Sequence, residues 1–243
     1  MRRDMDTGHI KVLSFDCYGT LIDWERGIID AFAPLRRHNP GLELSGAAAL
    51  SLFAAHEHAV QAADPALSYE QVLIAVHRRI AAELGAATYP GLDQAFAGSI
   101  RNWPPFADTT AALKRLKRRY RLLILSNVDN AGIAASIARL GVDFDAVLTA
   151  EDIGAYKPDR RNFEVLLQEV QERFGVGRDG LLHVAQSLFH DIAPASALRI
   201  ATAWIDRQHQ RHGGHWGATP KPDPLPEPDM VFDDLAGLAG KIT

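Results

Sequence analysis

Residues 14–23 read SFDCYGTLID and directly follow an apolar run that begins at Ile10, which predicts a buried β-strand. Asp16 then lies at the carboxyl end of that strand, where open α/β sheets bind ligands. Gly19 can take the positive φ of a tight turn, and we expect the Thr20 hydroxyl to orient the Asp16 carboxylate while backbone amides face an incoming anion. The alternative is an aspartate that only caps a turn, because Asp and Gly are common turn residues.

Further short apolar runs predict the other strands of one sheet. They cover residues 122–125, 146–148, 181–185, 201–205 and 230–232. From residue 108 onward they alternate with helical patterns, at residues 109–119 behind Asp108 as a candidate N-cap and at residues 160–174. Strands that alternate with helices predict an α/β fold with a doubly wound parallel sheet.

Residues 24–107 interrupt this alternation. Helix-like segments occur at residues 26–37, 47–63, 69–84 and 93–100, without a convincing strand. We therefore expect an inserted helical cap domain at 24–107, with residues 1–23 and 108–243 forming the α/β core domain. Pro104 and Pro105 would return the chain to the sheet, because consecutive prolines cannot continue a helix.

The composition excludes several classes of protein. The 243 residues are 47% hydrophobic and 23% charged, which is typical of a globular chain. A net charge of -4 gives no basic footprint for nucleic acid or an anionic membrane, and the basic run 114–121 reads as a solvated helix face. No apolar stretch approaches the roughly 18 residues of a membrane span. Cys17 is the single cysteine, and the opening MRRDMDTGHI lacks the apolar region of a signal peptide, so we predict a cytoplasmic location.

Polar residues follow two more of the predicted strands. Ser126 and Asn127 offer a hydroxyl and an amide to an anionic substrate, although both residue types also cap helices. Lys157 comes after the third strand, and Pro158 stiffens its loop. A lysine there can hold Asp16 ionised and offset the charge of the substrate, whereas the alternative is a surface lysine without a role.

The fourth such loop, residues 186–191, reads QSLFHD and follows the strand at 181–185. Asp191 would face the same crevice as Asp16, and Ser187 is a candidate substrate contact. Two carboxylates with a lysine between them suit a nucleophile and a base, one attacking carbon or phosphorus and the other preparing water. Alternatively, Asp191 caps a helix near Pro194.

The order Asp-x-Tyr-Gly-Thr-Leu, Ser-Asn, Lys-Pro and an acidic loop resembles the haloacid dehalogenase superfamily, most closely its type II 2-haloacid dehalogenases. The resemblance covers nearly the whole chain, including the cap and the strand at 201–205. It implies a Rossmann-like core and release of halide from a small 2-haloalkanoic acid through an ester on Asp16. It also implies a small anionic substrate, no metal or other cofactor, and a possible homodimer.

The resemblance assigns roles to six residues. They are Asp16 as nucleophile, Thr20 as its support, Ser126 and Asn127 as substrate-binding groups, Lys157 as charge partner and Asp191 as activator of water. Tyr18 is a further substrate-binding candidate.

Two rival functions stay open. In a Mg²⁺-dependent phosphatase of the same superfamily, Asp16 and Asp191 would hold the metal. Tyr18 opposes this, since those phosphatases have an aspartate two residues after the nucleophile, which protonates the leaving alkoxide. The other rival is a catalytically diverged binding protein that uses the cap for a partner.

The chain departs from the dehalogenase pattern at several positions. Residues 38–77 contain no Lys or Arg, although an arginine early in the cap is expected to cradle the halide. His56, Arg26, Trp24 and Trp103 are candidates to replace it. Phe163 and Leu188 stand where the family has a tyrosine and an asparagine, which removes two polar contacts. The cluster of His209, His212 and His215 suggests a metal site, but its irregular spacing in a Gly-rich loop favours solvent exposure.

Overall fold

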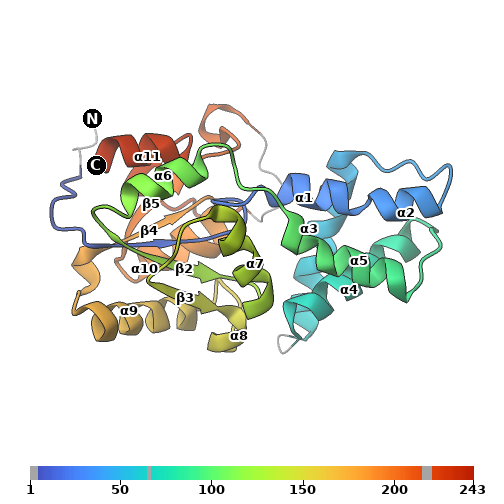
Figure 1. The fold of residues 1–243 in the computed structure, drawn as a ribbon, viewed down its shortest axis with the longest axis horizontal. Helices are drawn as coiled ribbons and strands as arrows, with labels where there is room; N and C mark the ends of the chain where they lie inside the picture. The colour runs from blue at the N-terminus through green and yellow to red at the C-terminus, as the bar shows by residue number, and fades with distance from the viewer. Residues whose placement is uncertain (1–4, 65–66, 215–220) are drawn as a thin grey trace.

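The computed structural model describes residues 5–64, 67–214 and 221–243. Its larger lobe is built on a parallel sheet with the strand order β3-β2-β1-β4-β5-β6 (Figure 1). The strands are β1 (Val12–Phe15), β2 (Arg121–Ser126), β3 (Ala146–Thr149), β4 (Leu181–Ala185), β5 (Ala201–Ile205) and β6 (Met230–Phe232). The predicted α/β class with a doubly wound parallel sheet is confirmed.

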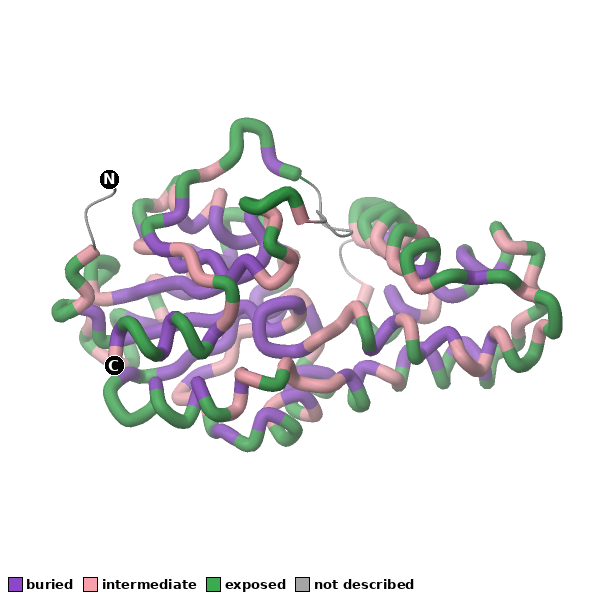
Figure 2. Tube along the Cα trace, turned by 90° about the horizontal axis from the view of Figure 1, so that it is seen from above, coloured by how far each residue is buried: buried purple, intermediate pink, exposed green. Residues whose placement is uncertain are grey.

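The strands are buried because helices cover both faces of the sheet (Figure 2). Along β1, Leu13 and Phe15 face one hydrophobic cluster and Val12 faces another, as the two-residue period of a strand requires. The first cluster includes residues of α6 and α11, and the second includes residues of α9. The helices and short turns of this lobe are α6 (Thr109–Leu116), α7 (Asn130–Leu140), α8 (Ala150–Ile153), α9 (Arg160–Phe174), η2 (Arg178–Gly180), η3 (Leu188–Ile192), α10 (Ala193–Ala197), η4 (Gln210–His212) and α11 (Leu235–Ile242).

A smaller helical lobe lies beyond the carboxyl ends of the strands (Figure 1). It contains α1 (Trp24–Ala31), α2 (Ala33–His38), α3 (Gly46–Ala63), α4 (Tyr69–Glu83), α5 (Pro90–Gly98) and η1 (Ser99–Asn102). Aromatic rings join these helices, with the centroid of Phe96 4.8 Å from Phe32 and 6.4 Å from Phe53. Such ring contacts contribute to packing beyond the buried area alone.

Two segments connect the lobes, and they run side by side. Ile22 forms an antiparallel bridge with Pro105, the Asp23 amide donates to the Pro104 carbonyl at 2.8 Å, and the Phe106 amide donates to the Leu21 carbonyl at 3.1 Å. The exit from β1 and the return to α6 are thereby hydrogen-bonded to each other.

Asp108 corrects one sequence expectation. It precedes α6, but its side chain makes no capping hydrogen bond to that helix. Its carboxylate instead accepts from Arg207 at 2.6 Å and from the Leu235 amide at 2.8 Å, at the start of α11. The sequence pattern predicted the start of α6 correctly, but the Asp108 carboxylate accepts a hydrogen bond from the first turn of α11 and not from α6.

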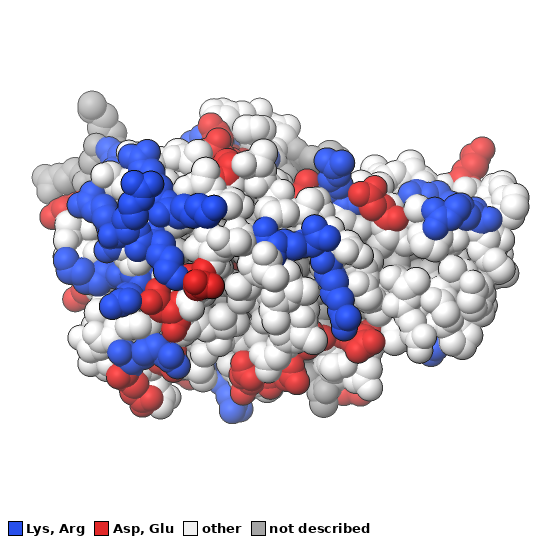
Figure 3. All heavy atoms as spheres, in the orientation of Figure 1, with Lys and Arg blue, Asp and Glu red and all other residues white. Residues whose placement is uncertain are grey.

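Other expectations differ only in detail. The predicted helix at 26–37 is divided at Phe32, because Pro34 lies in the first turn of α2 and lacks an amide hydrogen. The charged residues of the run 114–121 are exposed, on the part of the larger lobe where Lys and Arg gather in Figure 3. Within the described ranges, no helix is long and apolar enough to cross a membrane.

Candidate active site

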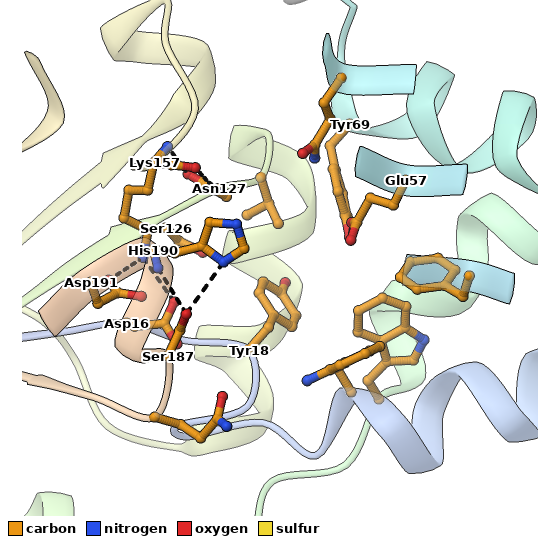
Figure 4. A pocket seen from close by; sticks show the side chains of 16 residues that line it. Asp16, Tyr18, Glu57, Tyr69, Ser126, Asn127, Lys157, Ser187, His190 and Asp191 are labelled. Atoms are coloured by element: carbon orange, nitrogen blue, oxygen red, sulfur yellow. Dashed lines mark hydrogen bonds and ion pairs between the residues drawn. The ribbon is translucent and has the colours of Figure 1, made fainter. Parts of the chain in front are cut away.

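Asp16, Lys157 and Asp191 meet at the carboxyl edge of the sheet (Figure 4). The Lys157 Nζ atom lies 2.9 Å from Asp16 Oδ1, 2.7 Å from Asp191 Oδ1 and 3.0 Å from the Leu125 carbonyl oxygen. These three acceptors match the three N–H donors of an ammonium group. The three charged side chains are buried, and one ammonium joins the two carboxylates.

Thr20 links Asp16 to the loop after β4. Its Oγ1 donates to Asp16 Oδ2 at 2.7 Å and accepts from the Gln186 amide at 2.9 Å. Gly19 has φ of +94°, and a Cβ there would lie 3.2 Å from both Gln186 Oε1 and Trp24 Nε1. The turn therefore needs glycine for its backbone conformation and for the close approach of its neighbours.

Asn127 holds the lysine loop through the backbone. Its Oδ1 accepts from the Lys157 amide at 2.6 Å, and its Nδ2 donates to the Lys157 carbonyl at 3.0 Å. Ser126 comes immediately before it at the end of β2, and its Oγ is buried with no hydrogen-bond partner among the described residues. A buried hydroxyl in that state is available to a polar ligand atom.

Asp191 is the better stabilised of the two carboxylates. Its Oδ1 also accepts from His183 Nε2 at 3.0 Å, and His183 Nδ1 lies 2.8 Å from the Ser14 hydroxyl. Burial opposes ionisation, but Lys157 and His183 outweigh it and lower the pKa of Asp191 to about 2. Asp191 Oδ2 is buried without a partner in the described part of the chain.

Asp16 shows the opposite shift. Burial raises the pKa of Asp16, and the charge of Asp191 adds to this, whereas Lys157 and Thr20 act in the other direction. Burial alone would lower the pKa of Lys157, but the two carboxylates raise it. Lys157 therefore stays cationic, and Asp16 is the carboxylate that binds a proton more readily.

These groups open into a cavity of about 100 Å³ between the sheet edge and the helical lobe. The sheet side is lined by Asp16, Tyr18, Ser126, Asn127, Val128, Lys157, Gln186, Ser187, His190 and Asp191, and the helical side by Trp24, Phe53, Glu57, Gln61, Tyr69 and Trp103. Tyr18 packs edge-on against Trp103 at 5.4 Å, and its hydroxyl lies 2.8 Å from the Ser136 hydroxyl.

Two further titratable groups line the cavity. Glu57, on α3, accepts a 2.7 Å hydrogen bond from the Tyr69 hydroxyl, and burial raises the pKa of Glu57 to about 7. His190 lies on η3, where Ser187 Oγ accepts from its amide at 2.9 Å. Burial lowers the pKa of His190 to about 4, so its imidazole is neutral at pH 7.

The structure brings most of the predicted site residues into the cavity, but not all. Thr20 is fully buried behind Asp16 and does not line the cavity, so it contacts the carboxylate and not a substrate. His56 bonds to Glu83 at 2.8 Å, and Arg26 is exposed beside Asp30, so neither replaces the missing arginine.

Sequence reasoning missed Phe53, Glu57, Gln61 and Tyr69. Glu57 and Gln61 are four residues apart on α3 and therefore lie on the same helix face. Two polar side chains at this spacing in an alanine-rich helix are the signal that could have identified them.

The histidine cluster gives no metal site within the described residues. His209 lies 3.5 Å from Asp233, His212 is exposed, and His215 lies outside the described residues. In the described part of the chain, no three His, Cys, Asp or Glu side chains are grouped to hold a metal ion.

Comparison with known proteins gives consistent matches. The model of the haloacid dehalogenase-like hydrolase family matches residues 10–178. The (S)-2-haloacid dehalogenase of Pseudomonas sp. (strain YL) is 29% identical over 82% of this chain and 84% of its own. The structure of L-2-haloacid dehalogenase from Xanthobacter autotrophicus with chloropropionic acid covalently bound superposes with a TM-score of 0.76, at 20% identity, over 96% of this chain and 98% of that one. The putative HAD-hydrolase YfnB from Bacillus subtilis, bound to magnesium, gives 0.75 at 16% identity over 96% and 98%.

Proposed function

Because the chain belongs to the haloacid dehalogenase-like hydrolase family, we propose that it removes halide from a small 2-haloalkanoic acid through an ester on Asp16. The observation that carries the proposal is the bridge of Lys157 between Asp16 and Asp191 at the floor of a small cavity. A nucleophile, a fixed positive charge and a second carboxylate are the groups that a two-step hydrolysis needs.

In the first step, an Asp16 oxygen attacks C2 of the substrate and the halide leaves with the bonding electrons. Lys157 keeps Asp16 ionised for this attack, and Thr20 fixes the orientation of the carboxylate through Oδ2. The Ser126 hydroxyl, which lines the cavity and has no hydrogen-bond partner among the described residues, is our candidate to bind the substrate carboxylate, with Asn127 beside it. Tyr18 and Ser187 line the same cavity and are the remaining candidate contacts.

In the second step, water attacks the ester carbonyl, the bond from that carbon to the substrate oxygen breaks, and Asp16 is restored. The 2-hydroxy acid leaves, and the proton taken from water goes to its departing oxygen. Asp191 is our candidate to take the proton, because Lys157 and His183 occupy only Oδ1 and leave the buried Oδ2 for water. His190 is the second candidate, as a neutral imidazole in the same cavity.

The donor set favours a reaction without metal. For a Mg²⁺-dependent phosphatase, the ion would be held by Asp16 and Asp191, but the Lys157 ammonium already lies within hydrogen-bond distance of both. A dication beside that ammonium would be repelled by it, and Tyr18 stands where those phosphatases have an aspartate. The residues present therefore favour a reaction without metal.

The division of the chain into a core and a cap belongs to the same proposal. Residues 24–107 would act as the cap domain that closes the cavity over the core of residues 1–23 and 108–243. We also propose a small anion as the substrate, a cytoplasmic location and a homodimer.

A substrate panel tests the reaction class. Halide and phosphate release are measured separately on 2-haloacids and phosphomonoesters, with and without EDTA, and Asp16→Asn serves as the inactive control. We expect halide release that EDTA leaves intact and Asp16→Asn abolishes. Phosphate release restored by Mg²⁺ would support the phosphatase, and no turnover in any assay would support the diverged binding protein.

A further inference from the structure

The group that binds the departing halide should lie on the helical side of the cavity. Displacement at carbon proceeds in line, so the halide departs on the face of C2 opposite the attacking Asp16 oxygen. Figure 4 shows Asp16 on the sheet side and Glu57 and Tyr69 on the opposite wall, contributed by α3 and α4. Asp16 and this wall line the same cavity of about 100 Å³.

Among the described residues that line the cavity, no cation is free to stabilise a halide. Lys157 is the only Lys or Arg among the described residues that line the cavity, and its three donors already bond to Asp16, Asp191 and the Leu125 carbonyl. His190 is neutral at pH 7, because burial lowers its pKa to about 4. The departing anion therefore needs a neutral hydrogen-bond donor.

Glu57 is arranged to be that donor. The Tyr69 hydroxyl donates to Glu57 Oε1 at 2.7 Å, which fixes the carboxyl group and assigns the proton of the acid form to Oε2. An ionised Glu57 would repel both the substrate carboxylate and the halide, whereas the acid form attracts them.

We propose, on the basis of the dehalogenation proposed above, that Glu57 in its acid form donates a hydrogen bond to the departing halide in place of a cationic side chain. The C2–oxygen bond to Asp16 forms as the carbon–halogen bond breaks, and the halide keeps the electron pair. Glu57 retains its proton, because hydrogen chloride and hydrogen bromide are far stronger acids than a carboxylic acid.

The protonation of Glu57 fits this task. Its pKa of about 7 reflects burial, which raises it, and the Tyr69 hydrogen bond, which lowers it. A bound anion raises it further and so favours the donating form. The titratable and charged groups around the cavity that face Glu57 are Tyr69 from α4, Tyr156 before α9, Tyr18 after β1 and, on the sheet side, Asp16, Lys157, His190 and Asp191.

The test compares 2-chloropropionate with 2-bromopropionate between pH 5.5 and 9. For the wild type we expect kcat/KM to fall above about pH 7, as Glu57 loses its proton. Glu57→Gln keeps a donor that does not titrate, so its profile should stay flat in that range. Glu57→Leu should be roughly 10- to 100-fold slower with chloride, and less affected with bromide, which is a weaker hydrogen-bond acceptor. Glu83→Gln, an exposed glutamate on α4, is the matched control and should behave as the wild type.

Each outcome separates this inference from the function on which it rests. If Glu57→Leu keeps the wild-type ratio of chloride to bromide rates, the assignment of Glu57 is overturned while dehalogenation stands. If Glu57→Leu does not fold, Glu57→Gln decides the question. A fall in its kcat/KM above pH 7 like that of the wild type would overturn the assignment of Glu57. Wild-type activity that rises above pH 7 would also overturn the assignment of Glu57. A wild type that releases no halide overturns the proposed function, and this inference with it.

Discussion

The Lys157 ammonium lies 2.7 Å from Oδ1 of Asp191, a buried carboxylate whose second oxygen has no partner in the described structure. His183 donates to the same Oδ1, so the carboxylate is fixed through one oxygen. This one-sided attachment supports the proposal that Asp191 acts as a base and is not merely the counter-ion of the lysine.

Asp191→Asn should stop the reaction halfway. The first step does not use Asp191 Oδ2, so halide should be released once, close to one equivalent per active site, and an ester should accumulate on Asp16. Mass spectrometry of the peptide that contains Asp16 would detect the added mass. Full steady-state turnover would transfer the role to another group, and His190→Gln would then be the variant to measure.

Lys157→Met should destabilise the protein more at high pH than at low pH. Removal of the ammonium leaves two buried carboxylates without a cation, at a cost of about 3–5 kcal/mol at neutral pH. Lys157 lowers the pKa of both carboxyl groups, so its loss raises both, and a proton at low pH then relieves part of the repulsion. Urea unfolding at pH 5 and pH 8 measures the difference, and an equal loss at both values would contradict this account.

Glu57→Gln should stabilise the protein at alkaline pH relative to the wild type. The pKa of Glu57 rises from 4.5 to about 7 in the folded protein, so its favourable contribution is complete below pH 4.5 and is lost as the pH rises through 7. The glutamine does not titrate, and its advantage at pH 8.5 over pH 5 should be on the order of 2 kcal/mol. Thermal unfolding of both proteins at the two pH values measures this. Glu43→Gln, at an exposed glutamate of the helical lobe, is the control. If the stability difference between Glu57→Gln and the wild type is the same at pH 5 and pH 8.5, Glu57 is ionised throughout.

Gly27→Ala should destabilise the protein, although alanine normally favours a helix. A Cβ at Gly27 in α1 would lie 2.3 Å from two ring atoms of Trp103, which is 2% exposed and cannot move aside freely. We expect a loss of about 1–3 kcal/mol in the free energy of unfolding. Gly98→Ala, at the exposed end of α5 with nothing within 4 Å, should instead stabilise by about 0.5–1 kcal/mol. A stable Gly27→Ala with unchanged activity would show that the ring shifts at little cost.

The sheet was predictable from sequence because each strand is a short, continuous apolar run. β4, β5 and β6 have the predicted bounds, and the loops that follow β1 to β4 hold the groups that meet at Lys157. Strand ends of a parallel sheet lie at one edge, so their residues converge whatever the details of packing.

The helical wall of the cavity was not predictable in the same way. The sequence shows that α3 is a helix, but apolar residues lie on several of its sides, so the rotation about its axis is not determined by pattern. His56 was the candidate, yet the helix turns Glu57 toward the cavity and His56 toward Glu83. Successive residues of a helix differ in direction by about 100°, and only tertiary packing determines which of them faces the cavity. Asp108 illustrates the same limit, since its partners Arg207 and Leu235 are distant in sequence.

The paired segments between the lobes restrict how the helical lobe can move relative to the sheet. Ile22 and Pro105 are bridged, and Arg207 binds both the Thr20 carbonyl and Asp108, which ties the ends of both segments to the larger lobe. Two strands tied together bend as one hinge, so opening would be a rotation of the helical lobe about a single axis. Such a rotation would carry Glu57 and Tyr69 away from Asp16 together and would leave the bridge of Lys157 between Asp16 and Asp191 undisturbed.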